Sequence, residues 1–376
     1  MSAPVMFLAL LASADTVPAT SPSALPAASR KVELFAVYNL DLTSGTGRIE
    51  RLDKLSLTAT GETGGLGWRG GRFKVNVLAS SGGRPNEGGG TLQGLDNIEV
   101  PDRGVRLFEA WFEQDLGGGS LRVGAYDLNS EFYTTSASAL FVGPSYGIGP
   151  ELSATGSRGP SIFPFTGLAA RGDVRIGASG IVRAAVINAA AGTLGDRGGI
   201  DTSFREGVLG IVEGGFERGA AKLAIGGWAY SKRHEVHGAS SPSDLGRTRG
   251  AYLLAQAPLA ESWSGFARAG VAGGGTTAFR ASVQGGLEKR PFLAIRPDSA
   301  AAFGVHHARL SPGERELARA AGEEPGAETG FELTISDHLF GPVSLQPSVQ
   351  WIHNPGGRRD ADPLLFGALR LTLELR

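Results

Sequence analysis

The chain has 376 residues, with 36 basic and 37 acidic side chains for a formal net charge of −1, 58 glycines and no cysteine. The charge balance argues against a nucleic-acid-binding protein, which would show a strong excess of basic residues. Without cysteine there are no disulfides and no thiolate metal sites, which is compatible with an envelope compartment. No run of about eighteen apolar residues is present, so no transmembrane helix is expected.

The N-terminus has features of an export signal. A compact apolar run at residues 5–12 ends in Ala12-Ser13-Ala14, a small-x-small pattern suited to cleavage before Asp15. We therefore expect residues 1–14 to be a signal peptide, although no Lys or Arg precedes the run; the alternatives are a disordered N-terminus or a misplaced start codon. Residues 15–30 are rich in Pro, Ala, Ser and Thr and are expected to be a disordered linker.

The rest of the chain, residues 31–376, has a dominant period of two. In its last segment, leucines at every second position from Leu369 to Leu375 alternate with Arg370, Thr372 and Glu374. A soluble sandwich also alternates, but here the polar face mixes Arg, Lys, Glu and Gln on strand after strand. Most segments reach the roughly 9–11 residues that a tilted transmembrane strand needs. The pattern predicts sixteen strands, near residues 31–42, 51–63, 71–81, 105–116, 119–127, 164–172, 174–189, 206–217, 220–231, 248–259, 262–273, 279–289, 299–310, 327–336, 341–353 and 364–375.

The connectors between these strands alternate between long loops and tight turns. This alternation is typical of an all-β, antiparallel up-and-down barrel in the bacterial outer membrane, and an even strand count puts both termini on the periplasmic side. Two connectors are exceptions, because residues 289–299 are long where a turn is expected and residues 273–277 are short where a loop is expected. The expected loops include residues 41–50, 82–104 and 128–163, and the expected turns include residues 64–70, 117–119 and 172–173.

Two further local features are expected. Pro347 falls inside a predicted strand and should mark a bulge or an irregular pairing, because proline donates no backbone hydrogen bond. Residues 312–324 begin with Pro and are rich in Glu, Arg, Leu and Ala, which predicts a short extracellular helix. Residues 136–140 are a weaker helix candidate.

Signals for catalysis or metal binding are weak. Gly-Ala-Ser-Gly at residues 177–180 is one residue short of a nucleophile elbow and lies in a strand pattern. His234 and His237 lie three apart in an expected outer loop, where solvated side chains are favoured over metal ligands. His306 and His307 are adjacent and would face opposite sides of a strand. We expect no cofactor and no metal.

The long loop at residues 128–163 is the best candidate for a functional element. It is the third outer loop and would either fold inward and narrow the lumen or cap the barrel, and the narrowest part of a pore decides its selectivity. Aromatic rings and charged groups suit a sugar, since rings stack on its apolar faces and charges bind its hydroxyls. Trp111 has an alternative place in a lipid-facing aromatic belt. Strand phase and loop position favour as pore-lining residues Arg72, Lys74, Glu109, Trp111, Glu113, Arg122, Tyr126 and Arg158.

Several segments resemble a known family. The sequence "ETGFELTISDHLFGPVSLQPSVQWIHNPGG", followed by "PLLFGALRLTLEL", is similar to the closing portion of the carbohydrate-selective porins of the OprB type. Upstream, "RLFEAWFEQDLGGGSLRVGAYDLNSEFYTTSASALFVGPSYG" resembles a strand–turn–strand and the loop after it. The resemblance implies a 16-stranded outer-membrane barrel that passes sugars by diffusion, with Asp127 and Glu131 at or near the channel. One departure is the end Leu375-Arg376, where such barrels commonly carry an outward aromatic residue.

We therefore expect a passive, carbohydrate-preferring porin that is not an enzyme. The expected mechanism is partial replacement of the hydration shell of a sugar at a constriction, weak enough to allow exit. The expected partners are small sugars, outer-membrane lipid and the barrel assembly machinery, with monomer and homotrimer both open. The alternative functions are an accessory barrel for polysaccharide export and an outer-membrane hydrolase.

Overall fold

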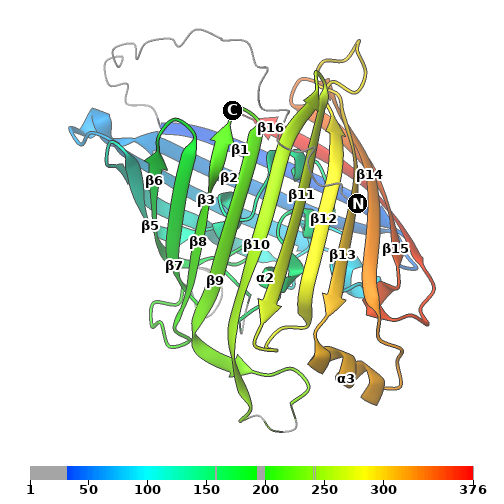
Figure 1. Ribbon diagram of the computed structural model, residues 1–376. Helices are drawn as coiled ribbons and strands as arrows, with labels where there is room; N and C mark the ends of the chain where they lie inside the picture. The colour runs from blue at the N-terminus through cyan, green and yellow to red at the C-terminus, as the bar shows by residue number, and fades with distance from the viewer. Residues whose placement is uncertain (1–31, 157–158, 193–199, 240, 242, 376) are drawn as a thin grey trace, which may run out of the picture.

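The protein is a closed β-barrel (Figure 1). The computed structural model describes residues 32–156, 159–192, 200–239, 241 and 243–375. Within these residues, each strand pairs antiparallel with its neighbours in sequence, and β1 closes the barrel by pairing with β16. The strands are β1 (Val32–Ser44), β2 (Glu50–Glu62), β3 (Gly71–Gly82), β4 (Gly104–Asp115), β5 (Gly119–Tyr126), β6 (Gly167–Ile176), β7 (Gly180–Asn188), β8 (Val208–Arg218), β9 (Ala221–Glu235), β10 (Leu245–Ala260), β11 (Trp263–Gly273), β12 (Phe279–Lys289), β13 (Ala300–Leu310), β14 (Ala327–Phe340), β15 (Val343–His353) and β16 (Leu364–Leu375).

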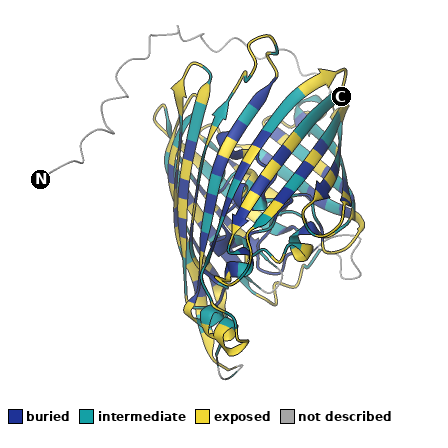
Figure 2. Ribbon diagram, turned by 90° about the vertical axis from the view of Figure 1, so that its right-hand side faces the viewer, coloured by how far each residue is buried: buried dark blue, intermediate teal, exposed yellow. Residues whose placement is uncertain are grey.

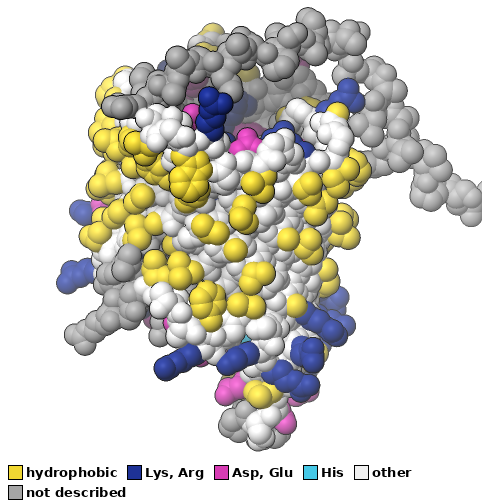
Figure 3. All heavy atoms as spheres, turned by 90° about the vertical axis from the view of Figure 1, so that its left-hand side faces the viewer, with side chains coloured by type: hydrophobic (Ala, Val, Ile, Leu, Met, Phe, Trp, Pro, Cys, Tyr) yellow, Lys and Arg dark blue, Asp and Glu magenta, His cyan; other side chains and the backbone are white. Residues whose placement is uncertain are grey.

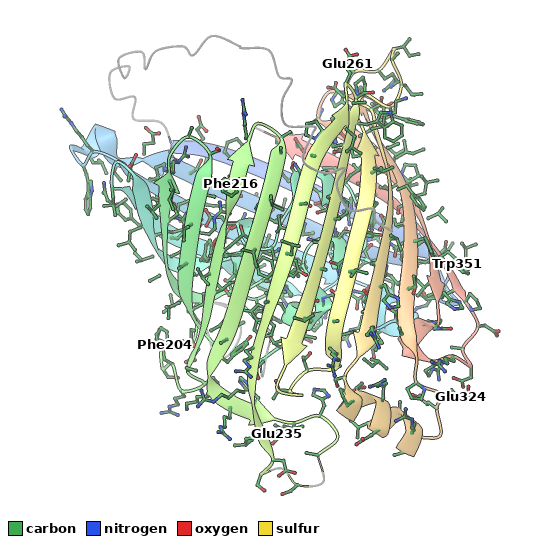
Figure 4. The ribbon with its side chains drawn as sticks, viewed as in Figure 1. Phe204, Phe216, Glu235, Glu261, Glu324 and Trp351 are labelled. Atoms are coloured by element: carbon green, nitrogen blue, oxygen red, sulfur yellow. The ribbon has the colours of Figure 1, made fainter. Side chains whose placement is uncertain are left out.

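Burial alternates along the strands as the period of two predicts (Figure 2). On β10, Leu253 is 52% exposed while its neighbours Tyr252 and Leu254 are buried. Large apolar side chains project from the outer wall, among them Phe216 and Trp351 (Figure 4). Many inward positions carry polar and charged groups, whereas the exposed apolar side chains lie on the outer face, which suits lipid. No helix in the described part of the chain is long and apolar enough to cross a membrane.

The two rims of the barrel differ as predicted. Short turns and the C-terminus lie at one rim, while long loops and α3 (Pro312–Ala320) lie at the other (Figure 1). Glu261 marks the rim of the turns, and Glu235 and Glu324 mark the rim of the loops (Figure 4). The Ser311 side chain caps α3 by accepting a hydrogen bond from the Glu314 amide, which explains why the helix begins there.

The predicted strands are confirmed, with one wrong turn. Gly172 and Asp173 were expected to form a turn, but they lie inside β6, which pairs with β5 on one side and with β7 on the other. The turn is made by residues 177–179 instead, so the Gly-Ala-Ser-Gly sequence at 177–180 is a strand connector. A local Gly-Asp signal is overridden here because both neighbouring strands bond to the segment.

The structure also bears on Pro347 and on the weak helix candidate. Pro347 lies opposite Leu369 of β16, but it has no pairing toward β14, where the ladder skips from Ser348 to Leu345. This is the irregular pairing expected of a residue without a backbone N–H. The weak helix candidate at 136–140 contains a short 3-10 helix, η4 (Ser136–Ser138). The signal peptide and linker expected at residues 1–30 lie outside the described residues.

Candidate channel site

The loop between β5 and β6 lies inside the barrel and does not cap its mouth. It folds through the short helices η3 (Leu128–Ser130), η4, η5 (Pro144–Tyr146) and α2 (Pro150–Ser153). Four of its aromatic side chains are almost fully enclosed: Phe132 and Tyr133 at 0% exposure, and Phe141 and Tyr146 at 2% and 1%. Inward folding is therefore confirmed, and the alternative of a solvent-exposed cap is wrong. We call residues 127–166 the lumen loop.

A single buried arginine on the barrel wall binds three points of the lumen loop. Arg268 of β11 donates from Nη1 to the carbonyl oxygens of Tyr133 (3.0 Å) and Gly147 (2.9 Å), and from Nη2 to the carbonyl of Ser145 (2.7 Å). Arg268 is 3% exposed. Bonds from a charged donor to buried carbonyls are among the stronger hydrogen bonds. The loop is thus bound to the wall and is not merely packed against it.

Carboxylates on two other strands of the barrel wall bind backbone amides of the same loop. Glu332 of β14 accepts hydrogen bonds from the amides of Val142 (2.7 Å) and Gly143 (2.9 Å). Glu213 of β8 accepts one from the amide of Tyr133 (2.9 Å). These bonds satisfy backbone groups that would otherwise be buried without a partner.

Glycines on the inner wall make room for the aromatic rings of the loop. A Cβ atom at Gly304 of β13 would lie 2.7 Å from ring atoms of both Phe141 and Tyr146. A Cβ atom at Gly270 of β11 would lie 1.8 Å from Oε1 of Glu151. No larger residue fits at these two positions, since the loop packs directly on the backbone of the strands. The loop therefore fills the lumen on the side of β8–β15, whereas the cavity that stays open is lined mainly by β2–β7.

Two arginines and two glutamates converge on the open side. Arg122 of β5 donates to Oε2 of Glu113 (2.9 Å), and Arg171 of β6 donates to the same oxygen (2.7 Å). Arg171 also bonds Glu131 of the lumen loop through Nε and Nη2, at 2.8 and 2.7 Å. We call Glu113, Arg122, Glu131 and Arg171 the arginine cluster. It joins the strands to the lumen loop through fixed charges.

Aromatic rings stand beside the arginine cluster. The guanidinium carbon of Arg122 lies 3.9 Å from the ring centroid of Trp111 and 5.3 Å from that of Tyr126. The Tyr126 hydroxyl donates to Glu131 (2.6 Å). Trp111 therefore faces the lumen, and its alternative position in a lipid-facing belt is wrong. Stacking on Trp111 holds the plane of the guanidinium in one orientation.

A water-accessible cavity of about 1020 Å³ opens beside this cluster, toward the rim of the short turns. Its lining includes the whole cluster together with Trp111 and Arg72. The Arg72 side chain pairs with Glu113, and Lys74 pairs with Glu109. The indole nitrogen of Trp111 donates to Glu109 (3.1 Å). The open side of the lumen is thus a wall of alternating charges with aromatic faces between them.

The structure places most of the predicted pore-lining residues together, with two exceptions. Asp127 accepts a hydrogen bond from the Asn129 amide (2.9 Å) and caps η3, so its contacts shape the start of the lumen loop. Arg158 lies outside the described residues. Arg171 was not among the predicted residues, although it lies inside the strand predicted at 164–172, because the residues in phase with it, Gly167 and Ala169, are small and do not mark a polar face.

The histidines are explained by local contacts. Nδ1 of His234 lies 2.7 Å from Oγ1 of Thr248, and Nδ1 of His237 lies 3.0 Å from Oε2 of Glu314 on α3. His306 is buried on the lumen side, whereas its neighbour His307 is half-buried on the other face of β13. Among the described residues, no group of three His, Cys, Asp or Glu side chains that could hold a metal is present.

A membrane-type barrel with a polar lumen narrowed by an internal loop defines a porin. The sequence profile of the carbohydrate-selective porin family OprB matches residues 48–375, and the chain belongs to this family. It is an outer-membrane porin through which small sugars diffuse. A search of curated protein sequences found no match.

Solved structures share the fold. The chain is 17% identical to Pseudomonas putida OprB in its high-pH structure, with a TM-score of 0.81 over 92% of this chain and 94% of that one. The low-pH structure of that protein gives 16% identity and a TM-score of 0.56, over 92% of each chain. A triple mutant of the Rhodopseudomonas blastica porin is 11% identical, with a TM-score of 0.54 over 92% of this chain and all of the other.

Proposed function

We propose that the arginine cluster and Trp111 form the site that selects sugars. The observation that carries this proposal is the stacking of Arg122 on Trp111 at 3.9 Å, beside the cavity of about 1020 Å³. A pyranose has apolar faces that suit an aromatic ring and hydroxyls that suit guanidinium and carboxylate groups. The cluster offers both kinds of group within one short stretch of the lumen wall.

The charged groups of the cluster already pair with one another, which favours passage of a sugar over tight binding of it. Each carboxylate already accepts hydrogen bonds from at least one guanidinium, so a sugar can bond only to the donors and acceptors that these ion pairs do not use. Such a site replaces part of the hydration shell of the sugar and releases the sugar again, which a diffusion channel requires. We propose that the lumen performs no chemical reaction. Membership of a porin family favours this reading over an export accessory or a hydrolase.

The Lys74–Glu109 pair lies next to Trp111 and extends the proposed path. We propose that Asp127 acts indirectly, by fixing the start of the lumen loop and with it the position of Glu131. We also propose that Arg158 acts near the channel. We also propose that residues 1–14 are the signal peptide and residues 15–30 the linker. Because an apolar outer wall fits either lipid or a second barrel, we propose both a monomer and a homotrimer as assembly states.

The test is single-channel conductance in a planar bilayer, with glucose titrated in. Arg122→Ala should weaken the block by glucose about tenfold, the effect of losing one hydrogen bond to a charged group worth ~1.5 kcal/mol. Trp111→Leu should also weaken it, because an aliphatic side chain cannot stack on a pyranose face. Arg319→Ala on α3 removes the same charge outside the lumen and is the matched control. Glucose block that is equal in all four proteins would contradict the proposed site.

A further inference from the structure

Five exposed arginines lie at the extracellular ends of four strands on one side of the barrel. Arg233 lies on β9, Arg247 and Arg249 on β10, Arg280 on β12 and Arg309 on β13, and all five are exposed. We call them the rim arginines. On the face shown in Figure 3, Lys and Arg side chains gather at the lower end, below the apolar side chains of the wall. This end is the rim of the long loops.

The rim arginines have no ionic partner among the described residues. No ion pair or side-chain hydrogen bond from any of them to the described part of the chain was found within bonding distance. Arg233 and Arg247 are directly opposite each other on paired strands. Like charges in this position repel and destabilise a sheet. The carboxylate of Glu235 on the same rim lies opposite Leu245 and not opposite an arginine. The arrangement therefore favours an external anion.

A hollow of about 850 Å³ lies among these arginines, at the ends of β9–β12. Arg249 and Arg280 contribute to its lining, whereas no Asp or Glu does. These two arginines lie on strands separated by β11, so their backbones are about 10 Å apart at the usual strand spacing. Two long side chains can reach across that distance to one group between them. Phosphate is the anion that arginine binds best, through paired N–H donors.

The same hollow has an apolar part that continues down the outer wall. Ala251 and Val271 contribute to its lining and are exposed, and Leu253 follows on the outward face of β10. A molecule that fits both parts carries a phosphate at one end and an alkyl chain at the other. The position, at the extracellular rim of an outer-membrane barrel, is the level of lipid headgroups.

We infer that the rim arginines bind a phosphate-bearing glycolipid of the outer leaflet of the membrane. The phosphate lies between Arg249 and Arg280, with Arg309 on the adjacent strand, and an acyl chain runs along the small side chains of β10 and β11. Bound lipid removes the repulsion between Arg233 and Arg247. This site lies outside the barrel and is independent of the sugar path through the lumen.

The test uses native mass spectrometry of the delipidated, folded barrel in detergent. The probes are diphosphoryl lipid A and the same lipid with both phosphates removed. The unaltered protein should bind the phosphorylated lipid at least about tenfold more tightly, and added salt should reduce the difference. Equal binding of the two lipids would overturn the inference, and this comparison needs no variant.

A variant then locates the binding to the rim arginines. The combined change R249S, R280S and R309S should abolish the preference for the phosphorylated lipid. The matched control is Arg218→Ser, which removes an exposed arginine at the opposite rim. Glucose-blocked conductance should be unchanged in both, which shows that the barrels are folded. A triple variant that keeps the full preference for phosphate would place the lipid elsewhere and refute the assignment.

Discussion

The attachment of the lumen loop to Arg268 gives a direct prediction about pore size. Replacement of Arg268 by Ala removes three hydrogen bonds to loop carbonyls, while the bonds between strands that hold the barrel remain. We therefore expect the loop to loosen and the barrel to stay folded. The pore should become wider and less steady, because nothing else on β11 donates to those carbonyls.

The size of the effect follows from the contacts. Hydrogen bonds from a charged donor contribute ~1.5–3 kcal/mol each, and removal of the guanidinium also relieves the cost of burying it. A net loss of about 3–5 kcal/mol in loop docking is reasonable, which lowers the ratio of docked to undocked loop by at least about a hundredfold. The Glu332 and Glu213 contacts would still tether the loop, so we expect fluctuation rather than permanent release.

Single-channel recordings test this prediction. Arg268→Ala should show a higher mean conductance with frequent changes of level, and weaker block by glucose. Gly304→Leu should have a similar effect by another route, since its side chain would displace the rings of Phe141 and Tyr146. The control is Arg218→Ala, which lies outside the lumen. Steady recordings at the unaltered conductance in both loop variants would refute the view that wall contacts set the pore.

Two other predictions concern closure of the barrel and pH. Arg370→Ala leaves the fully buried Asp41 without its bidentate partner (2.8 and 2.6 Å), which should cost about 3–5 kcal/mol and lower the midpoint of thermal unfolding on gels relative to Arg218→Ala. Burial raises the pKa of Glu99 in the β3–β4 loop to about 7, and its carboxylate accepts a hydrogen bond from the Asn86 amide (2.6 Å). Because the folded loop holds this proton more tightly than the unfolded chain does, loop stability should fall as pH rises from about 4.5 to about 7. Hydrogen-exchange protection around Asn86 should fall over that range, and a Glu99→Gln variant with the same slope would contradict this account.

The strands were predictable because their signal is local. The last strand was expected at 364–375 and lies at Leu364–Leu375, since every second residue there must face lipid. The one wrong turn shows the limit of local signals. Gly172 and Asp173 favour a turn by composition, but β5 and β7 both pair with this stretch and hold it extended.

The docking of the lumen loop was not predictable in the same way. Wall side chains bind backbone groups of the loop that are distant in sequence, as when Arg268 donates to the carbonyl of Tyr133. Every residue has a carbonyl, so the residue pattern does not show which of them will be bonded. A glycine in a strand carries no side chain, so the residue pattern does not show what packs against it. Gly304 is instead a place where an aromatic ring contacts the strand.

Inward charged residues consequently fall into two groups that strand phase alone cannot separate. Arg268 and Arg122 both face the lumen, but the loop covers Arg268 and leaves Arg122 beside the cavity. The first contributes to the stability of the constriction, and the second is available to a solute. Because the loop docks on the side rich in wall glycines, the open passage is displaced toward β3–β7. On the proposed sugar path, the position of the docked loop thus decides which charges line the passage, and we expect that a mutation on the far wall can change selectivity without altering a residue of that path.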